Sequence, residues 1–317
     1  MTSLITDDKY NLMVLKELEY CSVCPRNCHA DRLSGKYGYC RCDSSFNISS
    51  ITLHHGEEPV ISGKNGICNV FFSHCNLQCN FCQNFQISNN LSAISCQELS
   101  LNDISRKIIK QISHGAHAVG FVSPSHQVPQ MKIIVNSIRI NGYSPVFVYN
   151  TNAYDKHETI RELNNIISVY LPDYKYSDHI LAQKYSDASA YPEIALKAIQ
   201  EMYSQTGSTL LTNEEGIAAK GLIIRHLVLP GNIKNSFGVL ENIAEQVSPN
   251  VHISLMSQYY PTSKVCMVSP LNRKVRLEEY LKVVKHMEHL GMYKGWIQEP
   301  GSSQDFLPDF NKTKPFE

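Results

Sequence analysis

The stretch Asn69-Val-Phe-Phe-Ser-His-Cys75-Asn-Leu-Gln-Cys79-Asn-Phe-Cys82 joins a short apolar run to three closely spaced cysteines. Residues 69–73 are expected to form a strand, because short apolar runs of this length are typical of buried strands. The loop that follows has the spacing Cys-x3-Cys-x2-Cys. A single loop of this kind can wrap three thiolates around one [4Fe-4S] cluster, which leaves the fourth iron without a protein ligand.

An iron without a protein ligand can bind a small bidentate molecule. The amino and carboxylate groups of S-adenosylmethionine suit such a site, and electron transfer to the sulfonium then has a direct path. The competing interpretation is a zinc knuckle or a group of buried cysteines. Zinc normally recruits a fourth ligand at characteristic spacing, and the aromatic Phe81 inside the triplet is atypical of zinc sites. The loop therefore favours an iron–sulfur cluster.

Short apolar runs and amphipathic stretches alternate after this loop, which predicts repeated strand–helix units. Such units form a parallel sheet with right-handed crossovers, and six of them are too few for a closed eight-fold barrel. We therefore expect an α/β fold, a partial (βα)6 barrel, although a doubly wound open sheet would give nearly the same periodicity. The expected strands are 69–73, 118–122, 145–149, 169–171, 222–229, 252–257 and 295–298, and the expected helices are 101–114, 129–142, from 156, 192–205, 234–246 and 276–290.

The composition limits the classes of partner and the compartment. The 29 Lys and Arg residues equal the 29 Asp and Glu residues, so no net field favours nucleic acid or a membrane surface. Residues 1–20 lack the apolar core of a signal peptide, and no later stretch is apolar enough to span a bilayer. We expect a cytoplasmic protein, in which the 11 cysteines stay reduced.

Nine of those cysteines fall between Cys21 and Cys82, which divides the chain into a cysteine-rich segment, 1–65, and a barrel, 66–317. The N-terminal segment has little apolar material of its own, so a bound metal could stabilise it. Zinc and a second iron–sulfur cluster both remain open, with a structural or electron-relaying role. The simplest ligand set, with Cys42 or His29 as substitutes, is Cys21, Cys24, Cys28 and Cys40.

The cluster loop resembles that of the radical S-adenosylmethionine superfamily, in particular the uncharacterised iron–sulfur proteins similar to pyruvate formate-lyase activating enzymes. The residues that carry the resemblance are Phe71-Phe72-Ser73-His74 before the cysteines and Gln83-Asn84 after them, and the similarity extends over nearly the whole chain. It implies reductive cleavage of S-adenosylmethionine to methionine and a 5′-deoxyadenosyl radical, which abstracts a substrate hydrogen atom. A reductant such as flavodoxin or ferredoxin and a protein substrate, the glycine of a glycyl-radical enzyme, are the implied partners.

The resemblance also implies a role for polar residues at successive strand ends, where loops converge on one face of a parallel α/β sheet. Ser123 or Ser125 stands where many activating enzymes have a Gly-Gly-Glu motif that holds the methionine amino group, and this sequence departs from that motif. The competing interpretations are an ordinary polar turn for Ser123 and Ser125, a solvated ion pair for Asp173 and Lys175, and a core hydrogen bond for His226. The implied cofactor-binding residues further along are Asn150, Asn152, Asp173, Lys175 and His226.

Two other functions stay open at this point. The departure from the Gly-Gly-Glu motif at Ser123 and Ser125 is compatible with radical modification of another peptide or of a small metabolite. The N-terminal cysteines alone would also suit a non-catalytic iron–sulfur or zinc protein for electron transfer or partner binding, which predicts two complete sites of four protein ligands each.

Overall fold

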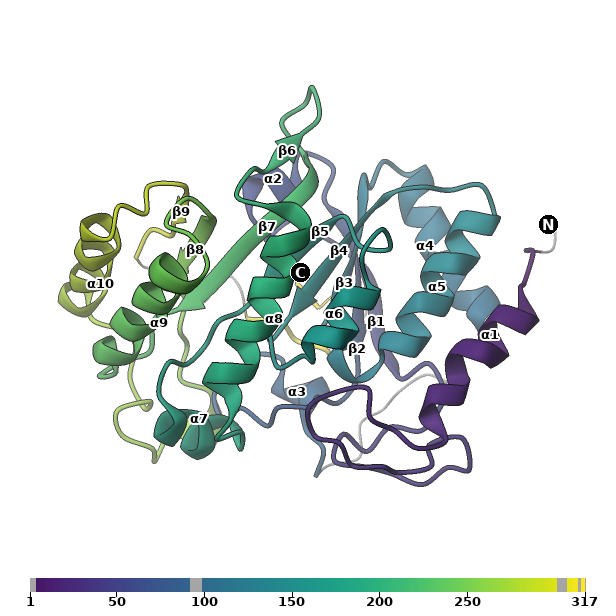
Figure 1. The fold of residues 1–317 in the computed structure, drawn as a ribbon, viewed down its shortest axis with the longest axis horizontal. Helices are drawn as coiled ribbons and strands as arrows, with labels where there is room; N and C mark the ends of the chain where they lie inside the picture. The colour runs from purple at the N-terminus through teal and green to yellow at the C-terminus, as the bar shows by residue number, and fades with distance from the viewer. Residues whose placement is uncertain (1–3, 92–98, 301–306, 313–314, 317) are drawn as a thin grey trace.

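The computed structural model describes residues 4–91, 99–300, 307–312 and 315–316. Its centre is a sheet in the order β1-β2-β3-β4-β5-β7-β8-β9, with β6 paired to β7 beside this path (Figure 1). The strands of the described part are β1 (Ile48–His54), β2 (Ile67–Phe72), β3 (Ala118–Val122), β4 (Val146–Thr151), β5 (Val169–Pro172), β6 (Leu211–Thr212), β7 (Ala218–Leu227), β8 (His252–Met256) and β9 (Gly295–Ile297).

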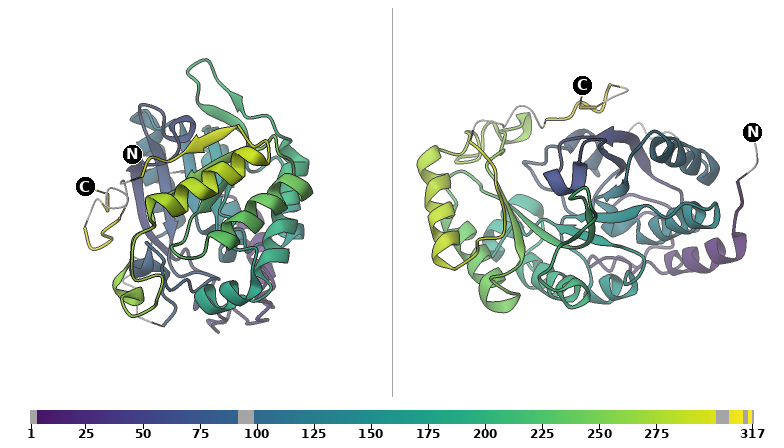
Figure 2. Two further views of the ribbon diagram at one scale, coloured as in Figure 1. Left: turned by 90° about the vertical axis from the view of Figure 1, so that its left-hand side faces the viewer. Right: turned by 90° about the horizontal axis from the view of Figure 1, so that it is seen from above.

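Neighbouring strands from β2 to β9 along this order run parallel, which confirms the predicted α/β class. The crossover helices wrap around the outside of the curved sheet, as expected for a partial barrel rather than a doubly wound sheet (Figure 2). The described helices are α1 (Asp8–Leu15), α2 (Pro59–Ser62), α3 (Phe85–Ser88), α4 (Leu101–Ser113), α5 (Val128–Ile140), α6 (His157–Glu162), α7 (His179–Ser186), α8 (Tyr191–Thr206), α9 (Ile233–Gln246) and α10 (Leu277–His289).

Helix α4 shows how local sequence sets these boundaries. The Ser100 hydroxyl accepts a hydrogen bond from the Asp103 backbone N–H at 3.2 Å, which caps the helix start. Gly115 follows the end of α4 with φ +104°, a conformation that favours glycine. Ile104 and Ile108 are fully buried on the inner face, so the helix forms where the sequence predicts it.

The sheet begins earlier in the chain than the expected boundary at residue 65. Strand β1 lies within residues 1–65 and pairs antiparallel with β2, from Ile48 opposite Phe72 to His54 opposite Ile67. The sequence reasoning missed β1 because Ser and Thr interrupt its apolar residues, so that its strand character depends on pairing with β2. Helix α1 packs on α5, so the N-terminal segment lies against the barrel.

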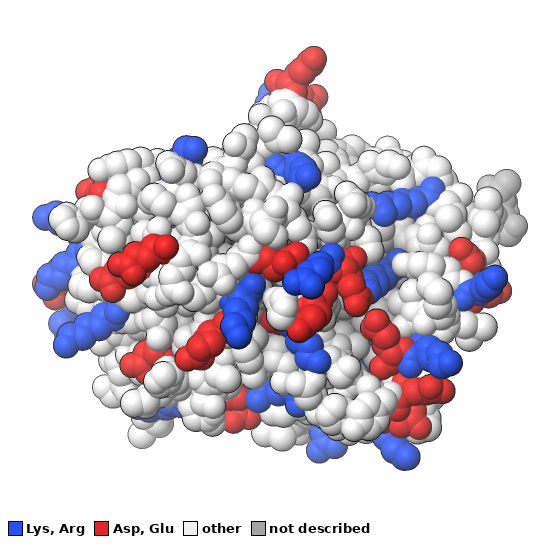
Figure 3. Space-filling model, viewed as in Figure 1, with Lys and Arg blue, Asp and Glu red and all other residues white. Residues whose placement is uncertain are grey.

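Two surface properties follow from the described residues. None of their helices is both long enough and apolar enough to cross a membrane. Lysine and arginine side chains lie among aspartates and glutamates over the helix-covered face, so neither sign of charge dominates there (Figure 3). This mixing agrees with the balanced charge of the sequence.

Candidate active site

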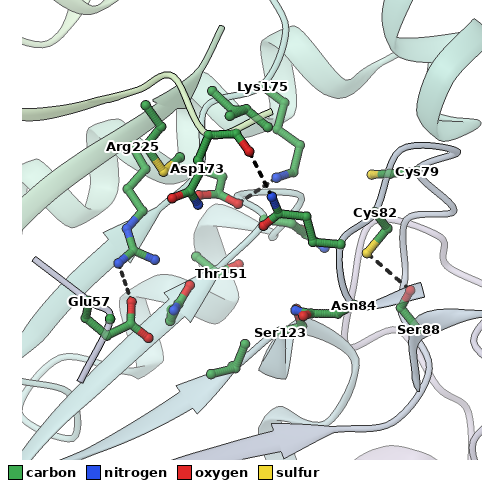
Figure 4. A pocket seen from close by; sticks show the side chains of 18 of the residues that line it. Glu57, Cys79, Cys82, Asn84, Ser88, Ser123, Thr151, Asp173, Lys175 and Arg225 are labelled. Atoms are coloured by element: carbon green, nitrogen blue, oxygen red, sulfur yellow. Dashed lines mark hydrogen bonds and ion pairs between the residues drawn. The ribbon is translucent and has the colours of Figure 1, made fainter. Parts of the chain in front are cut away.

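A cavity of about 440 Å³ lies where the C-terminal ends of the parallel strands meet the cluster loop. Predicted residues that line it include the three loop cysteines and polar residues after β3, β4 and β5 (Figure 4). Its apolar walls come from Phe71, Phe81, Trp296 and Phe316. Loops after several strands therefore supply one shared pocket, as in other parallel barrels.

Each sulfur of the cluster loop accepts a hydrogen bond from a side chain on another element. Asn152 donates from Nδ2 to Cys75 Sγ at 3.3 Å, after β4. Ser186, at the end of α7, donates to Cys79 Sγ at 3.0 Å. Ser88, in α3, donates to Cys82 Sγ at 3.3 Å (Figure 4). Donors aimed at sulfur stabilise thiolates, so the surroundings of all three suit metal-bound cysteines.

The donor set fits a [4Fe-4S] cluster. Such a cluster offers a separate iron to each of Cys75, Cys79 and Cys82, which all line the cavity. Burial raises the pKa of Cys75 to about 12 and that of Cys79 to about 11, so cluster binding must release their protons.

Ser123 and Asn150 line the cavity, and their side chains make no hydrogen bond to the described part of the protein. Ser123 has φ 55°, a left-handed conformation that is uncommon for serine, and its backbone N–H donates to Asn150 O at 2.8 Å. Both residues lie at the ends of neighbouring strands, β3 and β4. Within the described chain, their side chains are therefore available to a ligand.

Ser125 and Asn152 are placed differently from the expectation. Ser125 is buried outside the cavity lining, where its hydroxyl shares a 2.9 Å hydrogen bond with Thr151. Asn152 lines the cavity, but its amide is used by the protein: Nδ2 donates to Asn76 Oδ1 at 2.8 Å as well as to Cys75 Sγ, and Oδ1 accepts from Tyr154 N–H at 2.9 Å. Its contacts are those of a residue that positions the cluster loop.

Asp173 and Lys175 both line the cavity and form an ion pair of 2.6 Å between Oδ2 and Nζ. Burial by itself would lower the pKa of Lys175, but Asp173 and the nearby Cys79 outweigh it and raise that pKa. Lys175 is therefore a cation held beside the cluster loop. A cation in this place would favour an anionic cluster and the carboxylate of a bound amino acid.

His226 does not line the cavity, and its predicted contact with a ligand does not fit its surroundings. Its side chain is fully buried, with Nδ1 2.8 Å from Tyr174 O and Nε2 2.9 Å from Ser236 Oγ. Both ring nitrogens are thus used within the protein. The preceding residue, Arg225, faces the cavity instead, because successive side chains of a strand point to opposite faces.

Arg225 forms a buried charged group with Glu57 and Glu58, which the sequence reasoning missed. Its Nε donates to Glu58 Oε1 at 2.8 Å and its Nη2 to Glu58 Oε2 at 2.5 Å, and Glu57 also contacts Nη2 (Figure 4). Burial alone would raise the pKa of Glu57, but Arg225 outweighs it and lowers that pKa. No sequence pattern around Glu57, Glu58 and Pro59 indicates that the two glutamates pair with a residue of β7.

The C-terminal residues cover one side of the cavity. Phe316 lines it and packs on His54 with the ring centroids 4.1 Å apart, while Phe310 and Phe316 both contact Phe71. Gln86 in α3 holds this segment, since it donates to Asp309 Oδ1 at 3.1 Å and accepts from Phe310 N–H at 2.8 Å. The cluster loop and the C-terminal segment are therefore tied together.

Comparison with known proteins gives one curated relative and several similar structures, while no family model matches the chain. The chain is 26% identical over 277 residues to the uncharacterized protein MJ0674 of Methanocaldococcus jannaschii, with 84% of this chain and 74% of that protein covered. The crystal structure of HydG, a maturase of the [FeFe]-hydrogenase, aligns with a TM-score of 0.50 and 11% identity over 95% of this chain and 66% of that one. Methylornithine synthase, PylB, aligns with a TM-score of 0.45 and 13% identity over 72% and 64%.

Each alignment covers less than two thirds of the solved chain. At 11% identity, the alignment with HydG shows a similarity of fold alone. The chain shares the fold of HydG, an α/β fold with a mostly parallel, barrel-like sheet. A cysteine-rich segment precedes most of this sheet, as the sequence predicts.

Proposed function

We propose that this chain is a radical S-adenosylmethionine enzyme. The observation that carries the proposal is the loop of Cys75, Cys79 and Cys82, whose three sulfurs are hydrogen-bonded at one wall of a cavity. No fourth cysteine occurs among the described residues that line this cavity. Three protein ligands leave one iron open for S-adenosylmethionine.

The chain's own residues would bind and orient the cofactor. Bound together, a [4Fe-4S] cluster and S-adenosylmethionine supply one-electron cleavage of a carbon–sulfur bond, which yields methionine and a 5′-deoxyadenosyl radical. Ser123, Asn150 and Lys175 line the cavity; the first two would hydrogen-bond polar groups of the cofactor, and Lys175 would attract its carboxylate. Asn152 would act on the cluster side, by donating to Cys75 Sγ.

The apolar walls would exclude water from the reacting centre. Phe71 and Phe81 are buried, and Trp296 and Phe316 line the cavity. A dry site protects a reactive intermediate from side reactions and strengthens the electrostatic effect of the Asp173–Lys175 pair.

The test is anaerobic reconstitution with iron and sulfide, reduction, and assay for 5′-deoxyadenosine. Wild type and Cys266→Ala should form the product, because Cys266 is an exposed cysteine outside the cavity. Cys79→Ala should lose at least about three orders of magnitude in rate, since the cluster loses a ligand. Lack of product from wild type with a loaded and reduced cluster would favour a non-catalytic iron–sulfur protein instead.

The substrate proposal rests on the resemblance to activating enzymes: the radical would abstract hydrogen from a glycine of a partner enzyme. Flavodoxin or ferredoxin would supply the electron. The test is deuterium transfer from α-deuterated glycine residues of a candidate partner into 5′-deoxyadenosine. Turnover without such transfer, but with stimulation by a peptide or metabolite, would replace this substrate with that class.

A further inference from the structure

The N-terminal cysteines lie together in two turns beside the barrel. Cys21 pairs with the following turn through Cys21 N–H to Ala30 O at 3.1 Å and His29 N–H to Cys21 O at 2.9 Å. A second turn, from Cys24 to Asn27, is closed by a hydrogen bond of 3.2 Å. These backbone bonds bring Cys21, Cys24 and Cys28 close together in a short piece of chain.

Cys40 joins this group through Gly38. A Cβ atom added to Gly38 would lie 2.2 Å from Cys28 Sγ, so the sulfur of Cys28 rests against the chain two residues before Cys40. Only glycine permits this approach. Cys21, Cys24 and Cys40 are buried, with 4%, 7% and 5% of each residue exposed, and Cys28 is partly buried.

A buried arginine lies against these cysteines without a carboxylate partner. Arg32 is 1% exposed, and its guanidinium donates to the backbone oxygens of Asp43 and His126 and to Cys21 Sγ at 3.7 Å. It forms no ion pair with any carboxylate of the described chain. A buried cation favours nearby negative charge, which the Asp43 carboxylate and the thiolates of Cys21 and Cys40 can both supply. Metal ligation is what keeps several neighbouring cysteines in the thiolate form.

The surroundings distinguish the four ligands from the two substitutes suggested by the sequence. Cys42 is fully buried, and its Sγ lies 3.4 Å from Cys40 O and 3.8 Å from Ser73 O, both as a donor. His29 is exposed and stacks on Tyr20 at 4.2 Å. The thiol of Cys42 therefore serves as a hydrogen-bond donor beside Cys40, and the ring of His29 stacks on Tyr20, so Cys21, Cys24, Cys28 and Cys40 are the four proposed ligands.

Four cysteines can hold either one zinc ion or a [4Fe-4S] cluster, in which each cysteine binds its own iron. A hydrogen-bonded connection between this group and Cys75 favours the redox-active cluster, because zinc does not change its oxidation state.

A short path of bonds links the two groups of cysteines. Tyr39, covalently next to Cys40, offers its backbone oxygen to Asn90 Nδ2 at 2.9 Å. Asn90 in turn donates to Cys75 O at 2.8 Å and accepts from Cys75 N–H at 3.2 Å. Asn90 is buried, so this contact is shielded from water.

We propose that Cys21, Cys24, Cys28 and Cys40 hold a second [4Fe-4S] cluster, and that it passes single electrons through Tyr39 and Asn90 to the cluster at Cys75. A low-potential flavin or iron–sulfur protein donates one electron to the N-terminal cluster. That cluster is oxidised again as the cluster at Cys75 is reduced. No proton is transferred, and no covalent bond is formed or broken. The relay rests on the proposed radical function, whereas the metal site does not.

Iron content tests the metal site independently of activity. After anaerobic reconstitution, wild type and Cys266→Ala should carry about eight irons per chain, and Cys21→Ser/Cys24→Ser about four, as expected for two clusters and one. The triple variant Cys75→Ala/Cys79→Ala/Cys82→Ala should also retain about four irons with a [4Fe-4S] electron paramagnetic resonance signal. One zinc per chain in the triple variant, or no metal, would overturn the site. A signal that still shifts with S-adenosylmethionine shows that the double variant is folded.

Rapid-freeze spectroscopy tests the relay. With reduced flavodoxin as the donor, reduction of the cluster at Cys75 should be about tenfold or more slower in Cys21→Ser/Cys24→Ser than in wild type, a barrier change of about 1.4 kcal/mol. Dithionite, a small reductant, should reduce that cluster in both proteins. Equal rates with flavodoxin would overturn the relay while leaving the iron count as the test of the site.

Discussion

The side-chain amide of Asn152 donates a hydrogen bond to the sulfur of Cys75 over 3.3 Å. Asn152 lies just past the end of β4, and Cys75 begins the cluster loop after β2, so this contact ties two strand ends together. Hydrogen bonds to cluster sulfurs stabilise the reduced, more negative state. Asn152 is therefore placed to set the reduction potential of a cluster bound at this loop.

Replacing Asn152 with leucine should make the cluster harder to reduce. The potential should fall by roughly tens of millivolts, since one hydrogen bond to a charged group is lost. The measurement is a redox titration of the loaded protein followed by electron paramagnetic resonance. Asn150→Leu is the matched control, because Asn150 lines the cavity without touching a sulfur. It should leave the potential unchanged and weaken binding of S-adenosylmethionine by about tenfold. An unchanged potential in Asn152→Leu would remove this role.

Replacing Arg225 with methionine should destabilise the protein strongly. The two carboxylates of Glu57 and Glu58 would remain buried without their cation, at a cost of about 3–5 kcal/mol. The measurement is urea unfolding at neutral pH. Arg276→Met is the control, because its ion pair with Glu278 is exposed and contributes less than about 1 kcal/mol. Similar losses in the two variants would contradict a structural role for the buried group.

Two buried histidines should make the folded state sensitive to acid. Burial lowers the pKa of His126 to about 3 and that of His226 to about 4. Below pH 6.5 both histidines are protonated in the unfolded chain but stay neutral in the folded chain. The free energy of unfolding therefore decreases as the pH is lowered, by up to about 1.4 kcal/mol per pH unit for each histidine. This contribution is complete near neutral pH and is lost towards the folded-state pKa values.

Nuclear magnetic resonance of histidine-labelled protein checks this prediction. The ring signals of His126 and His226 should stay those of the neutral imidazole from pH 8 to pH 5, and His226→Asn should remove one of them. Titration of either signal near pH 6.5 would show that the side chain is solvated.

Replacing Gln86 with alanine should loosen the C-terminal segment. Gln86 makes two hydrogen bonds to Asp309 and Phe310, each contributing about 1 kcal/mol, so cleavage after Lys312 by trypsin should speed up several-fold. The readout is the rate at which the shortened chain appears. Gln200→Ala, on the surface of α8, should leave this rate unchanged. An unchanged rate in Gln86→Ala would mean that the phenylalanine contacts alone hold the segment.

Local patterns carried most of the prediction of the fold. Apolar runs and caps such as Ser100 act over a few residues, so the main strands and helices from β2 onward could be predicted in order, whereas the short elements α3, α7 and β6 were not predicted. Strand β1 could not, because its polar residues become a strand only when they pair with β2. The sequence also did not show which residues of β7 face the cavity, since a shift of one residue moves a side chain to the opposite face of the sheet.

By itself, the sequence determined the α/β class, the order of the main strand–helix units and a loop that presents Cys75, Cys79 and Cys82 together, because these features depend on spacing along the chain. Only the tertiary structure decided that Arg225 rather than His226 faces the cavity, and that Glu58, 167 residues away, is the partner of Arg225. Charges that are distant in sequence meet only when the whole barrel has folded around them, and burial then makes their pairing obligatory.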